Sequence, residues 1–149
     1  MAKPTQYDNL IITAIKTAFD ALKTSSANYH VVALKVWDSN AAPVTDDERP
    51  AYNISEGDED FLQEDASSTV HDNKLQVYID IIADSPSDCR KMKADAKKII
   101  KANLQWGVNW ILTTYYVTTQ KNVIDHLGNL IASRRIIIEV QYRQTAWSD

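Results

Sequence analysis

The sequence predicts an α+β domain, with two helices packed on one face of an antiparallel or mixed β-sheet of about four to five strands. Apolar residues recur at helical steps in residues 5–24 and again after Ser85, and they alternate with period two in Lys74–Ile82 and Ile131–Arg143. The 149 residues include only three glycines and four prolines, which disfavours a loop-dominated chain. We therefore expect one domain, 1–149, with the element order α-β-β-β-α-β-β.

The first third of the chain is expected to form a helix and two strands. Residues 5–24 carry an apolar stripe, and Thr5 with Asp8 has the spacing of a capping box. Tyr29–Trp37 is rich in β-branched and apolar residues, which is typical of a strand. Pro50–Ser55 can form a short strand, and Pro50 should begin it or lie at a sheet edge because proline has no N–H group to donate.

Acidic residues are concentrated in one part of the sequence. Ten of the 20 acidic residues lie between Asp46 and Asp72, where Arg49 is the single base. The charge there is about −9, whereas the other residues carry an excess of about +5. Mutual repulsion and a lack of aliphatic residues predict that Glu56–Asp72 is an exposed, mobile loop, inside an acidic insertion at about 38–73.

The second half is expected to contain the clearest strand, a helix and two further strands. Lys74–Ile82 alternates strictly, and Ser85 and Pro86 are suited to the N-cap and the first position of a helix. Trp110–Thr119 and Ile131–Arg143 should be strands, joined by a polar connection at Gln120–Asn129. The expected buried stripe of the helix consists of Cys89, Met92, Ala96, Ile99, Ile100 and Leu104.

The residue pattern does not indicate an enzyme, a cofactor site or a metal site. The three histidines are scattered, and the adjacent Asp125 and His126 are a poor catalytic pair because triad partners normally come from distant segments. Cys89 could be a nucleophile near a helix start, but its place on the apolar stripe favours a buried core residue. No glycine-rich phosphate loop is present.

Composition also limits the location of the chain. There is no run of 18 apolar residues for a membrane helix and no apolar signal core in the first residues. A single cysteine excludes an internal disulfide and fits a reducing cytosol. The acidic balance disfavours a broad basic face for nucleic acid.

Both charged regions allow several interpretations. The acidic insertion could be a solvated loop, a calcium site, or a docking or pore-facing surface, although it lacks the calcium-loop pattern. The helix after Ser85 carries six bases, which could be solvated, could bind nucleic acid, or could meet the acidic insertion of a neighbouring subunit. These six bases are Arg90, Lys91, Lys93, Lys97, Lys98 and Lys101.

Several stretches taken together resemble the tail terminator proteins of long-tailed bacteriophages, also called minor tail or tail completion proteins. The amphipathic first helix is followed by a strand near Val31–Trp37, the segment Arg49–Ile54 and the acidic Glu56–Asp60. The alternating strand Leu75–Ile82, the helix after Ser85-Pro86 and a closing strand at Arg134–Val140 come next. The resemblance covers most of the chain and rests on order and pattern. The long acidic connection and the aromatic-rich Trp106–Tyr116 depart from it.

The resemblance implies a structural, non-catalytic role in the virion. Such proteins form a ring, usually a hexamer, at the head-proximal end of the tail tube, where they stop tube growth and join the tail to the neck or connector. The implied partners are other copies of the chain, the tail tube protein, the neck protein and DNA that passes through the lumen without specific binding. Assembly would occur in the host cytoplasm, with no membrane involved.

Ring formation requires one surface patch to meet a different patch on the next subunit. The acidic insertion and the basic helix are a plausible complementary pair, and an edge strand at Pro50 could extend a neighbour's sheet. The residues expected at subunit or partner contacts are Arg49, Pro50, Tyr52, Glu56, Asp58, Glu59, Asp60, Arg90, Lys97, Lys98, Lys101, Arg134 and Arg135. The competing interpretations are a neck or head-completion adaptor of the same particle and a small cytosolic enzyme.

Overall fold

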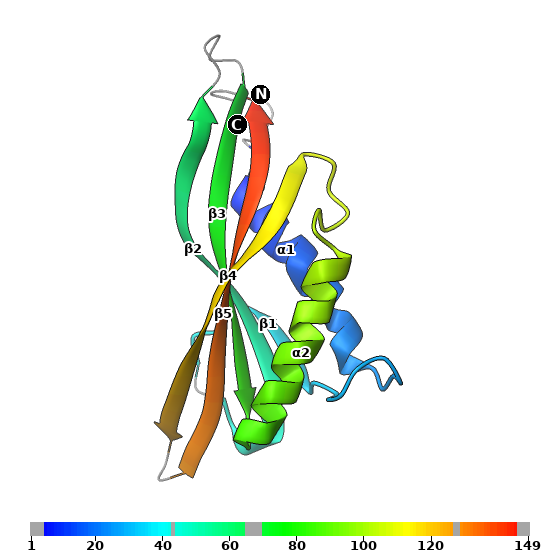
Figure 1. Cartoon of the computed structure of the whole chain (residues 1–149). Helices are drawn as coiled ribbons and strands as arrows, with labels where there is room; N and C mark the ends of the chain where they lie inside the picture. Colours follow the sequence, from blue (N-terminus) through cyan, green and yellow to red (C-terminus); the bar gives the residue numbers. More distant parts are fainter. Residues whose placement is uncertain (1–4, 43, 65–69, 127–128, 146–149) are drawn as a thin grey trace.

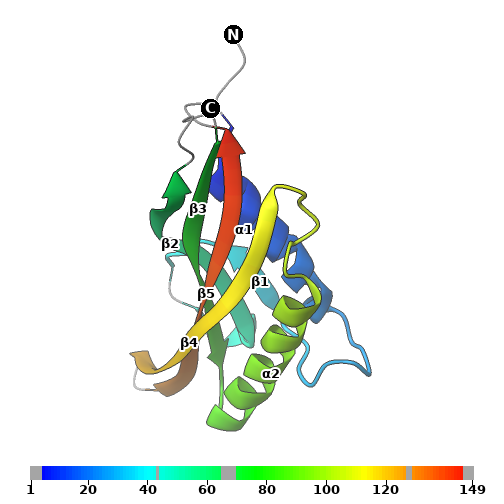
Figure 2. The same cartoon turned by 45° about the horizontal axis from the view of Figure 1, so that its top comes forward.

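The structure is a computed structural model, which describes residues 5–42, 44–64, 70–126 and 129–145 (Figure 1). A mixed sheet forms one layer, and two helices cover one of its faces (Figures 1 and 2). This arrangement confirms the predicted α+β class. In chain order the elements are α1 (Tyr7–Phe19), the 3-10 turn η1 (Asp20–Lys23), β1 (Lys35–Asp38), the 3-10 turn η2 (Asp46–Glu48), β2 (Ala51–Glu64), β3 (Val70–Ala83), α2 (Pro86–Ala102), β4 (Ile111–His126) and β5 (Asn129–Thr145).

The sheet has the strand order β1-β2-β3-β5-β4. β1 is parallel to β2, and the other neighbouring pairs are antiparallel. β1 and β4 are therefore the two edge strands. The β2–β3 and β4–β5 hairpins extend from opposite ends of the molecule (Figure 1).

The period-two pattern of the sequence correctly identifies the buried face of the sheet. Leu75, Val77 and Ile79 of β3 are buried under the helices, as are Ile136 and Ile138 of β5. The intervening residues from Gln76 to Asp80 and from Arg135 to Gln141 are half-buried on the open face. Burial of this one continuous apolar face supplies the main driving force for packing the helices on the sheet.

The first helix is shorter than predicted and begins differently. α1 packs its apolar stripe into the core, where the ring of Phe19 lies 5.5 Å from that of Tyr52. The N-cap residue is Gln6, which makes no side-chain capping hydrogen bond, so the capping box predicted at Thr5 is wrong. The chain tightens after Phe19 into the 3-10 turn η1 and ends its helical path at Lys23.

The second helix begins as predicted. The Ser85 hydroxyl accepts a hydrogen bond from the backbone N–H of Asp88 at 3.1 Å, and Pro86 occupies the first turn. Cys89 is buried, as expected for a core residue, and burial raises the pKa of its thiol. Leu104 lies beyond the end of α2 and is 44% exposed, so its predicted place in the buried stripe is wrong.

A buried carboxylate on α2 explains why the predicted strand at 29–37 is reduced to β1. Asp95 lies among the apolar residues of the helix and accepts hydrogen bonds from the backbone N–H groups of His30 and Val31 at 2.9–3.0 Å. These two amides are satisfied by a side chain instead of by a neighbouring strand. Regular pairing therefore begins only at Lys35.

The described part of the acidic stretch is strand, which corrects the prediction of a loop at Glu56–Asp72, and residues 65–69 lie outside the described residues. β2 continues to Glu64 and is paired with β3 as far as Glu64 and His71, with bulges on the way. Repulsion between solvated carboxylates is weak, so it does not outweigh the hydrogen bonds of an antiparallel ladder. The polar connection predicted at 120–129 is wrong for the described residues, because β4 continues to His126 in a ladder with β5, which begins at Asn129; residues 127 and 128 lie outside the described part.

Candidate functional site

The sheet presents two unpaired strand edges on opposite sides of the molecule. β4 pairs only with β5, so its outer edge has no strand partner among the described residues. On the other side, β1 pairs with β2 only between Ala51 and Ile54. The outer edge of β2 from Ser55 to Glu64 is therefore unpaired within the described chain. Free edges of this length are templates for pairing with another chain.

The β4 edge carries exposed apolar side chains. Tyr115 is 53% exposed and Val117 is 50% exposed, and Tyr116 between them is also exposed. Val117 lies at a bulge between the pairs Tyr116↔Ile138 and Thr118↔Ile137. The sequence places apolar residues at successive positions here, a departure from period two that indicates a strand with two apolar faces. The predicted contact residues did not include this edge.

The β2 edge is acidic, and two of its carboxylates lie close to other carboxylates. The pKa of Glu56 is raised by burial, by the charge of Asp8 on α1 and its hydrogen bond, and by the charge of Asp38. The pKa of Glu59 is raised by burial and by the charges of Asp8 and Glu56. Tyr142 donates its hydroxyl hydrogen bond to Glu59. No base forms an ion pair with these carboxylates in the described part of the chain.

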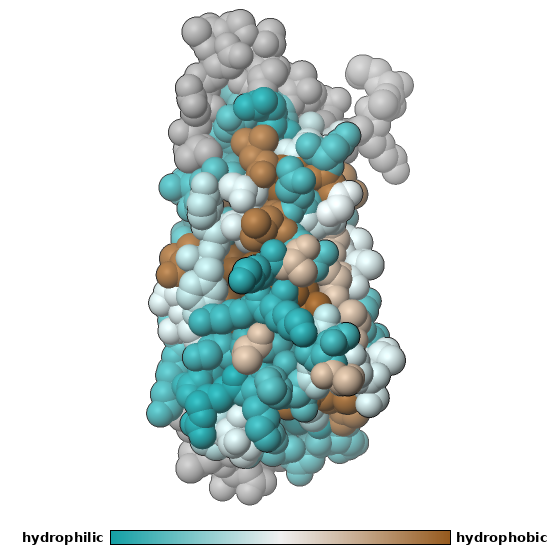
Figure 3. All heavy atoms as spheres, turned by 45° about the vertical axis from the view of Figure 1, so that its right-hand side comes forward, coloured by the Kyte–Doolittle hydropathy of each residue, from teal (hydrophilic) through white to brown (hydrophobic). Residues whose placement is uncertain are grey.

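An apolar groove lies between the end of α2 and β4. It has a volume of about 300 Å³ and is lined by Lys97, Ile100, Lys101, Leu104, Thr114 and Tyr116. The ammonium of Lys97 lies 4.5 Å from the centre of the Tyr116 ring, a cation–π contact. Figure 3 turns the side that carries α2 forward and shows hydrophobic patches above a mostly hydrophilic lower half.

The bases of α2 have no acidic partner within the described part of the chain. Among the described residues, no carboxylate oxygen lies within 4.0 Å of any lysine or arginine nitrogen on this helix. Lys98 is nevertheless held, since its ammonium donates to the carbonyl of Asn28 at 3.0 Å and lies 5.4 Å from the Tyr29 ring. Arg90, Lys97 and Lys101 are exposed. Of the lysines predicted at contacts, Lys97 and Lys101 are the two that rim the groove.

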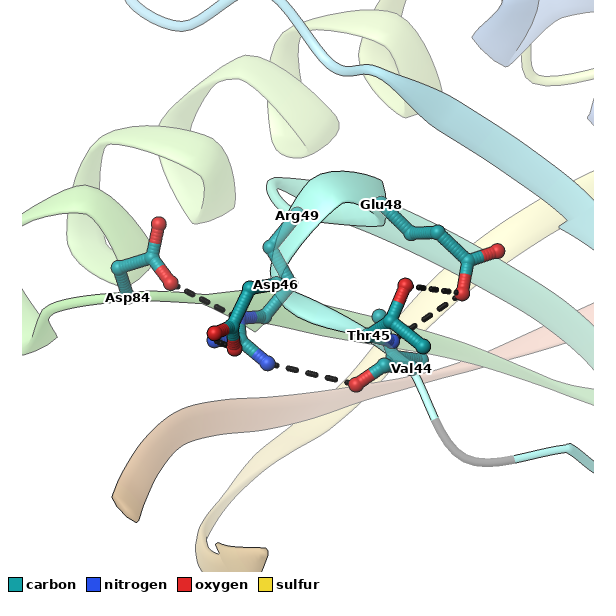
Figure 4. Close-up of polar contacts among 6 residues, drawn as sticks. All are labelled: Val44, Thr45, Asp46, Glu48, Arg49 and Asp84. Atoms are coloured by element: carbon teal, nitrogen blue, oxygen red, sulfur yellow. Dashed lines mark hydrogen bonds and ion pairs between the residues drawn. The ribbon is translucent and has the colours of Figure 1, made fainter. Parts of the chain in front are cut away.

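Arg49, predicted as a contact residue, is an internal anchor (Figure 4). Its side chain is only 6% exposed and donates hydrogen bonds to Asp84 at 2.8 Å, to the carbonyl of Val44 at 3.3 Å and to Asp46. The hydrogen bond with Asp84 raises the pKa of Arg49 further. These bonds tie the segment before β2 to the end of β3, so the guanidinium is not available to a partner.

The segment around Arg49 has further internal bonds. Glu48 accepts from the backbone N–H and the hydroxyl of Thr45 at 3.1 and 2.8 Å, and these bonds lower its pKa (Figure 4). The carbonyl of Pro50 accepts from Leu34 at 2.8 Å. Tyr52 is fully buried and donates to the carbonyl of Met92 at 3.1 Å, so its side chain offers no surface to another subunit.

The open face of the sheet is covered by ion pairs between β3 and β5. Arg135 donates two hydrogen bonds to Asp80, at 2.7 and 3.1 Å, and its guanidinium lies 4.5 Å from the Tyr78 ring. Arg143 and Asp72 form a second pair with the same distances, also directly across the two strands. Arg135 is thus engaged within the chain, and Arg134 lies half-buried on the opposite face beside Cys89.

The described residues contain no group of three or more histidine, cysteine or acidic side chains that could hold a metal ion. Neither described helix combines the length and the apolar character that a membrane crossing requires. What the geometry defines is a two-layer α+β domain with two chemically different free edges, one acidic and one apolar with a lysine-rimmed groove behind it.

This fold is similar to that of a chain in a solved structure of the virion of a native gene transfer agent particle. The TM-score is 0.58, with 11% sequence identity, over 94% of this chain and 100% of that chain. At this identity the likeness shows a common fold. No protein-family model and no curated protein matches the sequence.

Proposed function

We propose that the chain is a structural, non-catalytic virion protein that forms a ring at the head-proximal end of a phage-like tail tube. The observation that carries this proposal is the likeness in fold to a complete chain of a virion particle. The element order that resembles the tail terminator family points independently to the same kind of particle. In this role the ring ends tube polymerisation and joins the tail to the neck.

The two free edges support a ring. An edge of β4 that meets the edge of β2 on the next copy makes a heterologous contact, because the two surfaces differ. A heterologous contact repeats from subunit to subunit. It forms a closed ring when the rotation between neighbouring subunits is a whole-number fraction of a full turn. The family resemblance implies six subunits.

The distribution of charge supports a role around DNA. The ion pairs of the open face balance one another, so this face carries little net charge to hold a polyanion. The exposed carboxylates of β2 add negative charge at one end of the molecule. A ring with these surfaces would let DNA pass without specific binding, while its two rims meet the tail tube protein and the neck protein.

The test combines mass measurement with localisation. Native mass spectrometry of the purified chain should show a closed ring, and labelled protein should bind the upper end of purified tails. Tails assembled without the protein should overgrow. A protein that is monomeric and never binds tube ends contradicts the proposal, and binding to the neck side alone, with normal tube length in its absence, favours a neck adaptor.

A further inference from the structure

We propose that the groove between α2 and β4 is the docking site for the acidic end of β2 from a second copy of the chain. The inference rests on the proposed function, because it names the contact that would join neighbouring subunits in the ring. The groove is defined by Ile100, Leu104, Thr114 and Tyr116, with Lys97 and Lys101 on its rim.

The groove has the chemistry of a site for an acidic segment with apolar residues. Its walls are aliphatic and aromatic, and its two ammonium groups have no carboxylate partner in the described chain. Leu104 and Tyr116 remain 44% and 42% exposed beside it. A ligand that buries them and also brings carboxylates to Lys97 and Lys101 would remove exposed apolar surface and satisfy both charges.

The acidic end of β2 has the complementary chemistry. Glu56 and Glu59 repel each other and Asp8, and no base neutralises them within the described chain. In the sequence, Asp58 and Asp60 add two more acids, and Phe61 and Leu62 follow directly. The pKa of both glutamates is raised by burial and then by neighbouring carboxylates, and docking against lysines would offset the repulsion from those carboxylates.

The strand register places the two surfaces at the same level of the sheet. Glu56 pairs with Val77, which pairs with Ile138, which pairs with Tyr116. By the same steps, Glu59 corresponds through Leu75 and Val140 to Thr114. The residues in these two rows lie on the helix-covered face of the sheet, as the groove does. Rotation of a second copy about an axis along the strands therefore brings Glu56 and Glu59 level with the groove lining.

The docking strand must come from another molecule, because β2 cannot reach the groove of its own chain. β3 and β5 lie between β2 and β4. Three strand spacings amount to about 14 Å. β2 runs opposite to β4 across the sheet, so a β2 strand from a rotated copy would approach the free β4 edge in the antiparallel sense.

Charge reversal tests the docking in solution. Lys97→Glu with Lys101→Glu should weaken assembly at least tenfold, measured as the oligomer dissociation constant by native mass spectrometry and sedimentation. The matched control, Arg90→Glu with Lys91→Glu, makes the same change in net charge near the start of α2 and should assemble normally. Adding Glu56→Lys with Glu59→Lys to the groove variant should restore assembly. If the groove variant assembles like the control, the docking is wrong while the ring remains.

A peptide experiment separates the docking from the ring. A fluorescent peptide of residues 55–64 should bind the Glu56→Lys/Glu59→Lys variant, whose groove is intact and whose own strand is reversed. Binding should fall at least tenfold when Lys97→Glu/Lys101→Glu is added, or when Phe61 and Leu62 of the peptide are changed to serine. Circular dichroism checks that each variant is folded. Absence of saturable peptide binding overturns the docking whatever the oligomeric state of the wild-type chain.

Discussion

Arg49 illustrates how a charged residue in an acidic region can serve the fold instead of a partner. Its guanidinium is buried, whereas the carboxylates of Asp84 and Asp46 that it contacts remain 60% and 78% exposed. The planar guanidinium uses three separate nitrogens to reach three acceptors on two segments, whereas an ammonium group has all its donors on one nitrogen. This side chain therefore attaches the segment before β2 to the end of β3.

We expect Arg49→Met to lower the free energy of unfolding by about 1–3 kcal/mol, because charged hydrogen bonds are lost while both carboxylates stay hydrated. Arg49→Lys should recover only part of this loss. Urea denaturation measures the change, with the exposed Lys91→Met as the control. Equal stability of Arg49→Met and the control would contradict the anchoring role.

The carboxylates at the start of α1 and on β2 predict a dependence on pH. The pKa values of Glu56 and Glu59 are raised in the folded state, so the folded state binds their protons more tightly than the unfolded state does. The folded protein is therefore more stable when both groups are protonated, and it loses this stability as pH rises through the folded pKa values. Glu56→Gln and Glu59→Gln should therefore stabilise the monomer at pH 7, by about 0.5 kcal/mol or less because both groups are partly solvated. At about pH 3 the gain should vanish. A gain that is equal at both pH values would contradict this account.

The burial of single residues could be predicted where it follows the period-two pattern of a strand. It could not be predicted where it depends on contacts between segments that are distant in the sequence. The alternation of Leu75, Val77 and Ile79 identifies the buried face without any structural knowledge. By contrast, Arg49 and Lys97 are both bases in the sequence, but one is buried among acceptors and the other rims a groove. That difference depends on contacts between distant segments, such as Arg49 with Asp84, which local sequence does not encode.

At the scale of elements, pairing decides what becomes a strand. The acidic residues after Ser55 have poor strand propensity, yet they pair with β3, which is a strong strand and is fixed on its other side by β5. Local repulsion alone predicts a loop, whereas the hydrogen bonds to β3 make the segment a strand. The reverse holds for residues 29–34, which have high strand propensity but form no strand there, because Asp95 satisfies the amides of His30 and Val31.

Helix capping provides an element-scale prediction with a matched control. Ser85→Ala removes the hydroxyl that accepts from the N–H of Asp88, so it should destabilise the protein by about 1 kcal/mol. Thr5→Ala makes a similar change before α1, where no side chain caps the helix, and should have an effect close to zero. Thermal denaturation of the two variants measures both. A larger loss for Thr5→Ala than for Ser85→Ala would reverse the assignment of the caps.

At the scale of the whole molecule, the charge imbalance seen in the sequence becomes a separation in space. Glu56, Asp58, Glu59 and Asp60 lie on the free part of β2, whereas Lys97 and Lys101 lie on α2 behind the opposite edge, with no carboxylate partner in the described chain. Such a molecule has two different ends for assembly, which favours repetition around a ring over a twofold dimer. The sequence predicts that these two surfaces are complementary, and this stays a prediction; the edge position of β4 and the groove beside it follow only from the strand order and the packing of α2.

A mixture of two charge-reversed chains tests both the direction of the contact and the parity of the ring. Chains with Lys97→Glu/Lys101→Glu and chains with Glu56→Lys/Glu59→Lys should each stay dispersed, because one surface of every contact repels its neighbour. In an equal mixture, an intact groove meets an intact strand at one contact, and a reversed groove meets a reversed strand at the next. Only strict alternation satisfies every contact, so a ring of six should reform with three chains of each kind, which native mass spectrometry resolves by mass. Rings of unequal composition would contradict the alternation, and a ring with an odd number of subunits could not be restored at all.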